Sequence, residues 1–238
     1  MNRASKVRQT GFSLIELAIV LVIIGLLIGG GIVALQATTE RQQRAEQRQQ
    51  LRQINDALYG YAMSRSYLPC PDTSYPPNGE EDRDSEGECD QEIGTLPWAT
   101  LGVGARDAWG NRLRYRVAEN YAAQPNGELG YGLTDGPQTA ISVYEDESET
   151  RLIAEQVPAI VISFGPDGGR VWADAGFNCP GLSQGFSLEA SGNCQEDTEV
   201  FYYPGYQRDD GDGGFRQMLS WLSEPVFKAR MIEAGHLP

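Results

Sequence analysis

Glu16 is the one ionisable residue in an apolar run from Phe12 to Leu35. A carboxylate inside a long apolar helix is costly, so such a residue normally has a partner and a function. If the chain is cut after Gly11, the new α-amino group of Phe12 is the nearest cation. Within one helix this amine points along the axis, whereas the amine of a neighbouring, axially shifted helix could reach Glu16 more directly. The residue types therefore predict ion pairing between helices, with Glu16 setting their stagger.

Four cysteines provide a second kind of chemistry. Their spacing favours two local disulfides, Cys70 with Cys89 and Cys179 with Cys194, among the connectivities that four cysteines allow. Each bridge would contribute about 3 kcal/mol by constraining the unfolded chain. A zinc site is the alternative, but the sequence has no C-x-x-C pair and only one histidine, His236.

Two acidic segments contain the oxygen ligands that calcium prefers. Residues 69–97 combine prolines with many carboxylates, and we expect a solvated irregular loop there in preference to a calcium site. A second segment, residues 207–215, holds three aspartates among glycines: Asp209, Asp210 and Asp212. An EF-hand register counted from Asp210 puts Trp221 where the bidentate glutamate belongs, so that motif fails. Calcium at the three aspartates stays an alternative, and no other cofactor is expected.

Catalysis and nucleic-acid binding are both disfavoured. A Ser-His-Asp arrangement would have to use His236, and the sequence has no G-x-S-x-G elbow and no P-loop. A sequence with 33 acidic residues always offers pairs of carboxylates, so the presence of such a pair is no evidence for catalysis. The net charge of −14 repels nucleic acid and anionic lipid. We therefore expect a protein that is not an enzyme.

The apolar run must position the Glu16 carboxylate. Its 24 residues from Phe12 to Leu35, at about 1.5 Å per residue, span the roughly 30 Å core of a bilayer. The run is too long for an ordinary secretory signal and lacks an A-x-A cleavage site. Three basic residues precede it and an acidic remainder follows, which predicts an N-in, C-out orientation. The rest of the chain would then lie outside the cytoplasm, where disulfides form.

The hexapeptide Gly11-Phe12-Ser13-Leu14-Ile15-Glu16, behind a basic leader, resembles the class III signal of type IV prepilins and pseudopilins. The resemblance implies that a prepilin peptidase cuts between Gly11 and Phe12 and methylates Phe12, and that Glu16 registers subunits in a filament. The family often has a helix-kinking proline near Val33; this chain instead has glycines at 29–31. A plain membrane anchor would explain the apolar run but not a glutamate five residues into it.

The sequence predicts four segments: a prepilin leader at 1–11, a transmembrane helix at 12–35, an amphipathic continuation of this helix at 36–66, and a globular head at 67–238. No proline interrupts the chain between Leu35 and Pro69. One face of the continuation is apolar at helical spacing, through Leu51, Ile54, Leu58, Tyr61 and Ala62.

The sequence of the head predicts several short strands. Residues 112–117 alternate, with three arginines on one side and Leu113, Tyr115 and Val117 on the other. They follow a turn signal at 107–111 that resembles the D-x-W-G-x-x-x-x-Y segment of the major pseudopilin of type II secretion systems. Further strand candidates are 139–144, 158–164, 170–173 and 199–203, of which 158–164 suits a central strand covered on both faces.

The sequence of the C-terminal tail, residues 215–235, predicts two short helices. The first would place Phe215, Met218, Leu219 and Leu222 on one face, and the second would begin behind Ser223 and end at Gly235. A helix followed by strands favours the α+β class, with the long N-terminal helix packed on an antiparallel β-sheet head as in pilins.

The resemblance implies a structural subunit of a type IV pilus or a type II secretion pseudopilus, and the size of the head suggests a minor one. Its partners would be other pilin or pseudopilin subunits, the prepilin peptidase and the inner-membrane assembly platform. It would sit in the bacterial inner membrane with a single pass and a periplasmic head, and would become periplasmic or extracellular in a filament. The alternative is a membrane-anchored extracytoplasmic binding module that does not enter a filament.

Overall fold

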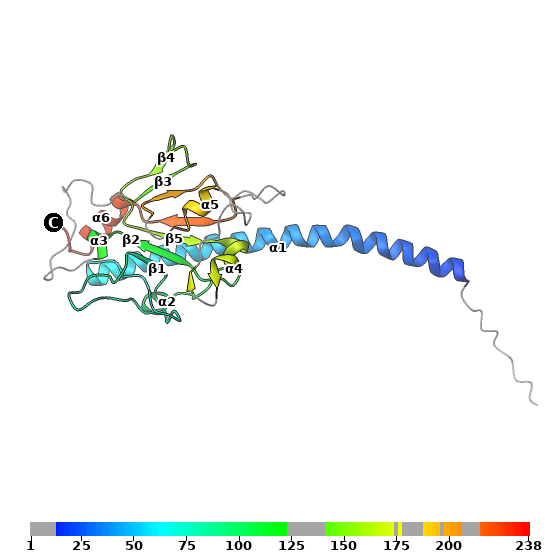
Figure 1. Ribbon diagram of the computed structural model, residues 1–238, viewed down its shortest axis with the longest axis horizontal. Helices are drawn as coiled ribbons and strands as arrows, with labels where there is room; N and C mark the ends of the chain where they lie inside the picture. Colours follow the sequence, from blue (N-terminus) through cyan, green and yellow to red (C-terminus); the bar gives the residue numbers. More distant parts are fainter. Residues whose placement is uncertain (1–12, 123–140, 174–175, 178–187, 196–197, 206–214) are drawn as a thin grey trace, which may run out of the picture. The chain divides into compact units, whose positions relative to one another are not determined.

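The computed structural model describes residues 13–122, 141–173, 176–177, 188–195, 198–205 and 215–238, without the side chains of 26–37, 170, 172–173, 176–177 and 188–189 (Figure 1). The chain forms two units, Met1–Arg44 and Ala45–Pro238. The helices are α1 (Leu14–Arg65), α2 (Trp98–Leu101), α3 (Glu119–Ala122), the 3-10 turn η2 (Gly165–Asp167), α4 (Gly168–Val171), α5 (Leu188–Gly192) and α6 (Glu224–Glu233). The strands are β1 (Ile93–Thr95), β2 (Arg114–Val117), β3 (Ser142–Tyr144), β4 (Leu152–Ala154), β5 (Ala159–Ser163), β6 (Trp172–Ala173), β7 (Gly176–Phe177), β8 (Val200–Tyr202) and β9 (Met218–Trp221).

Helix α1 contains 52 residues and ends at Arg65, next to the predicted end at Ser66. Its part within the second unit buries an apolar stripe made of Leu51, Ile54, Leu58 and Ala62. Ser66 then adopts a left-handed backbone conformation with φ of 76°, and Pro69 follows. These residues stop the helix because neither a left-handed residue nor a proline continues it.

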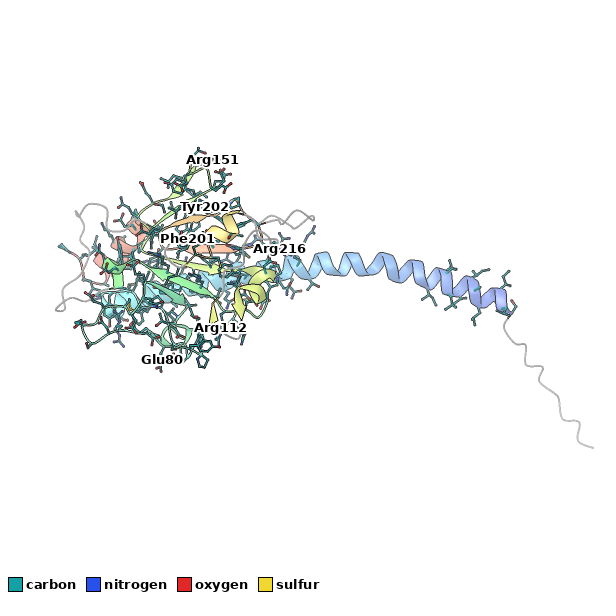
Figure 2. All side chains as sticks on the ribbon, viewed as in Figure 1. Glu80, Arg112, Arg151, Phe201, Tyr202 and Arg216 are labelled. Carbon is teal, nitrogen blue, oxygen red and sulfur yellow. A yellow bond between two sulfur atoms is a disulfide. The ribbon has the colours of Figure 1, made fainter. Side chains whose placement is uncertain are left out.

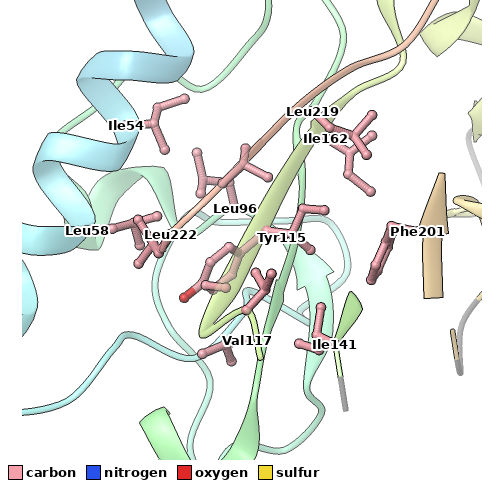
Figure 3. Packing of buried hydrophobic residues seen from close by; sticks show 14 of the residues in the cluster. Ile54, Leu58, Leu96, Tyr115, Val117, Ile141, Ile162, Phe201, Leu219 and Leu222 are labelled. Carbon is pink, nitrogen blue, oxygen red and sulfur yellow. The ribbon is translucent and has the colours of Figure 1, made fainter. Parts of the chain in front are cut away.

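The core of the head is a four-stranded antiparallel sheet with the strand order β1-β2-β5-β9. All five residues of β5 are buried, as the apolar segment predicts for a central strand. On one face, Tyr115, Val161 and Ser220 form a row across three strands. Asn55 of α1 donates a hydrogen bond from Nδ2 to Ser220 Oγ at 2.8 Å. Figure 3 shows the same face, with Ile54 and Leu58 of α1 turned toward the sheet.

The opposite face of this sheet carries Arg114 and Arg116, and it is covered. A smaller sheet with the order β4-β3-β8 contributes the fully buried Phe201, which lies near Ile162 (Figure 3). In this sheet β3 pairs antiparallel with β4 and parallel with β8. Arg116 donates to the Thr198 carbonyl at 2.5 Å and pairs with the Glu92 carboxylate at 2.7 Å. The predicted alternation of β2 therefore separates two buried faces.

The α+β class and the antiparallel sheet on a long helix are confirmed. One local prediction is wrong, and another is confirmed only in part. Residues 218–221 form the strand β9 and not a helix, because they complete the sheet beside β5. Residues 170–173 join the end of α4 to the two-residue strand β6. The second tail helix is confirmed as α6, with Ser223 at the N-cap and Gly235 beyond its end at φ of 78°.

Candidate functional site

The described N-terminal segment opens with a reciprocal hydrogen-bonded cap. The backbone N–H of Ser13 donates to Glu16 Oε2 at 3.0 Å, and the backbone N–H of Glu16 donates to Ser13 Oγ at 3.3 Å. This is the capping-box arrangement, in which a serine at the N-cap and a glutamate three residues later satisfy each other's backbone donors. The carboxylate also lies at the positive end of the helix dipole, which favours its charge.

The cap gives Glu16 a partner in its own chain. The predicted partner was an amine of a neighbouring helix, whereas the structure places the carboxylate on the Ser13 N–H. The S-x-x-E pattern was the signal that would have found this contact. Gly11 and Phe12, the predicted cleavage and methylation residues, lie outside the described residues.

Apolar side chains surround the first turns of α1. Every side chain from Ser13 to Ile24 is exposed, including Leu14 at 91% and Ile15 at 69%. A helix that is apolar on all sides normally ends up surrounded by other apolar groups. Among the residues that the structure describes, no helix has the length and apolar character required to cross a membrane.

Within the second unit, α1 is tied to the predicted turn at 107–111. Gln47 Oε1 accepts the Ala108 N–H at 2.8 Å, and Gln50 Nε2 donates to the Arg106 carbonyl at 2.7 Å. The turn is organised by the buried Asp107, whose carboxylate accepts the N–H groups of Trp109 and Asn111.

Asp107 also joins this turn to the central strand. Its Oδ2 accepts the Ser163 hydroxyl at 2.7 Å, and Ser163 Oγ accepts the Gly165 N–H at 3.1 Å. Burial raises the pKa of Asp107 above its ordinary value, and the hydrogen bonds from Ser163, Asn111 and Trp109 oppose that rise. The D-x-W-G turn is thus a structural joint between α1, β2 and β5.

Cys70 and Cys89 form a disulfide, the pair that their spacing favours, with Cα atoms 5.3 Å apart. These two sulfurs are therefore not zinc ligands. Cys194 is also disulfide-bonded. Its predicted partner, Cys179, lies outside the described residues, so that pairing stays a prediction.

Carboxylates organise the loop that the first disulfide closes. Glu81 accepts hydrogen bonds from the Tyr61 hydroxyl at 2.5 Å, the Cys70 N–H at 3.0 Å and Arg83 Nε at 2.8 Å. Burial and the bond to Glu81 raise the pKa of Tyr61. Asp72 is buried and accepts the Gly79 N–H at 2.6 Å. The prediction of a solvated acidic loop is therefore wrong for Glu81 and Asp72, because their carboxylates accept hydrogen bonds from groups within the protein.

The candidates for metal binding and catalysis receive no support from the described residues. No group of three or more His, Cys, Asp or Glu side chains within them could hold a metal ion. Asp209, Asp210 and Asp212 lie outside the described residues, so calcium there is untested. His236 is 2.8 Å from Ser66 Oγ through Nδ1 and 2.8 Å from the Met63 carbonyl through Nε2. A neutral carbonyl stands where a triad needs a carboxylate, so this contact holds the tail onto α1.

One family matches the chain. The model of the prokaryotic N-terminal methylation motif covers residues 6–32, which include Gly11, Phe12 and Glu16. No curated protein and no solved structure matches the chain. The motif at residues 6–32, together with a head built of a long helix on an antiparallel sheet, supports a similarity of this chain to type IV pilin-like proteins.

Proposed function

We propose that this protein is a minor structural subunit of a type IV pilus or a type II secretion pseudopilus. A prepilin peptidase cuts it after Gly11 and methylates the new N-terminus at Phe12. Glu16 then directs its addition to the filament. The observation that carries the proposal is the methylation motif over residues 6–32.

The capping box gives Glu16 two alternative partners. In a free subunit the carboxylate accepts the N–H of its own Ser13. In a filament it pairs with the methylated amine of Phe12 in a neighbouring subunit. The exchange replaces a neutral donor with a charged one, and charge-assisted hydrogen bonds are about twice as strong as neutral ones. The axial position of the incoming subunit is fixed because another offset leaves the amine unpaired.

The remaining features of the proposal concern location and partners. The subunit waits in the inner membrane with its N-terminus in the cytoplasm and its head in the periplasm. The prepilin peptidase, the assembly platform and other pilin or pseudopilin subunits are its partners. The minor role is favoured by a head of well over 150 residues with a disulfide-closed acidic loop, because such bulk suits a filament end better than a repeating wall.

The first test is the mass of the N-terminal peptide of protein isolated from its native membranes. We expect a peptide that begins at Phe12 and carries one additional methyl group. A chain that still begins at Met1 would contradict processing, and the membrane-anchored binding module would then be the better explanation.

The second test separates the charge of Glu16 from its capping function. Glu16→Gln keeps a side-chain acceptor for the Ser13 N–H, since glutamine also serves in a capping box, but it removes the charge. Ser13→Ala removes the serine half of the cap at a local cost of about 1 kcal/mol and leaves the carboxylate. We expect Glu16→Gln to abolish incorporation into filaments in cells, with processing unchanged, and Ser13→Ala to preserve it. Loss of incorporation in Ser13→Ala, with incorporation preserved in Glu16→Gln, would mean that the cap, and not the charge, is required.

A further inference from the structure

The strand β4 is an open edge of the head. It is the outermost strand of the sheet β4-β3-β8, and its described pairing is with β3 alone. Leu152 and Ile153 of this strand are 48% and 44% exposed, although large apolar residues of the head are mostly buried. Consecutive strand residues point to opposite faces, so both faces of β4 offer apolar surface beside unpaired backbone.

The charges around β4 are acidic. In the turn before the strand, Arg151 pairs with Glu145, and Glu149 accepts the Tyr202 hydroxyl at 3.1 Å. Figure 2 shows Arg151 at the outer end of this hairpin, beyond Tyr202. Glu147 in the turn and Glu155 directly after β4 are exposed, and neither has an ion-pair partner among the described residues. An apolar edge is thus flanked on both sides by an uncompensated carboxylate.

A second copy of this chain is a poor occupant of the edge. Two β4 strands would bring their acidic turns together, and the whole chain carries a net charge of −14. The strand has only three residues and its register with β3 shifts at Val143 and Tyr144. Short and irregular edges resist open-ended sheet pairing between identical chains.

We propose that β4 docks an extended segment of another protein that has consecutive apolar residues in its middle and lysine or arginine at both ends. The segment adds as a strand to β4, so that its backbone satisfies the open edge and its apolar side chains cover Leu152 and Ile153. Its cations pair with Glu147 and Glu155. This inference is independent of cleavage at Gly11 and of filament assembly.

The test uses the full chain in a nonionic detergent and two synthetic eight-residue peptides. One, the valine–lysine peptide, has a central run of valines with lysines at both ends, and the other, the valine–glutamate peptide, has the same valines with glutamates at both ends. We expect the valine–lysine peptide to bind, to slow amide hydrogen exchange at residues 152–154, and to weaken as salt is raised. The valine–glutamate peptide should not bind. Protection in the acidic loop at 80–92 in place of β4, or equal binding of both peptides, would overturn the proposal.

Two matched double variants test which carboxylates the peptide needs for binding. Glu147→Gln combined with Glu155→Gln should weaken binding of the valine–lysine peptide by about tenfold, since it removes two exposed ion pairs. Glu80→Gln combined with Glu86→Gln removes the same charge from exposed positions in the acidic loop and should change the affinity by less than about twofold. If the loop variant weakens binding as much as the β4 variant, the attraction is a property of the net charge and the proposed site is wrong.

Discussion

Replacing Arg83 with alanine should destabilise the head by about 3 kcal/mol. Arg83 donates to the Glu81 carboxylate at 2.8 Å and to the carbonyls of residues 68, 87 and 122 at 2.8–3.0 Å. Its guanidinium also lies 4.5 Å from the centre of the Tyr67 ring. Each bond to a charged group is worth about 1.5–3 kcal/mol, but water can replace part of this network because the side chain is 17% exposed. Four such bonds at the lower value would contribute about 6 kcal/mol, and replacement by water reduces the expected loss to about half of this, or about 3 kcal/mol.

Urea unfolding of the full chain in nonionic detergent, followed by tryptophan fluorescence, measures this loss. All four tryptophans belong to the head, so the signal reports on this unit. Arg83→Lys is the control: it keeps a charge for Glu81 but lacks the planar fork that reaches several carbonyls, and we expect a loss of about 1.5 kcal/mol. An alanine variant within about 0.5 kcal/mol of the parent would refute the idea that Arg83 holds the loop together.

Three further changes test the packing of the head. Because burial raises the pKa of Asp107 above 3.8, its stabilising contribution is full below that pH and is lost as the pH rises through the folded-state pKa. Asp107→Asn should therefore gain stability relative to the parent between about pH 3.5 and 7 in urea unfolding, and a constant difference would contradict this sign. Gly79→Ala puts a methyl group against the Trp98 ring at a φ of 86° and should cost about 2–4 kcal/mol by thermal unfolding; an unchanged melting temperature would argue against the close contact. Tyr115→Phe removes the buried hydroxyl that donates to the Pro69 carbonyl at 3.0 Å and should cost about 1–2 kcal/mol by the same method, whereas a stabilised variant would mean that this bond contributes nothing.

The architecture was predictable where periodicity is unambiguous. The long helix has no proline before Pro69, and an apolar stripe marks its buried face. The central strand β5 is apolar on both parities, and the turn at 107–111 combines Asp, Gly and Asn. In each case local chemistry and tertiary packing favour the same structure, so the sequence pattern is sufficient.

The predictions failed where a partner distant in sequence determines the structure of a segment or the burial of its side chains. Residues 218–221 have apolar spacing that fits a helix as well as a strand, and only the free edge of β5 selects the strand. The alternation of β2 puts Arg114 and Arg116 on one side, but it does not indicate that β8 and the residues before it cover that side. At the candidate site, the apolar run singles out Glu16, but its bond to Ser13 was not predicted, because a carboxylate in an apolar run suggests a cationic partner before it suggests a backbone donor.

The attachment of the tail to α1 has a consequence for the order in which the head folds. Asn55 bonds to Ser220 across 165 residues of sequence, and His236 bonds to the Met63 carbonyl across 173. The apolar stripe of α1 at residues 51–62 therefore cannot be fully covered until residues 219–237 have been synthesised and have packed against it. Long-range contacts of this kind form slowly. Until then the chain exposes a bare helix face, which favours binding by a chaperone or folding that waits for the complete head.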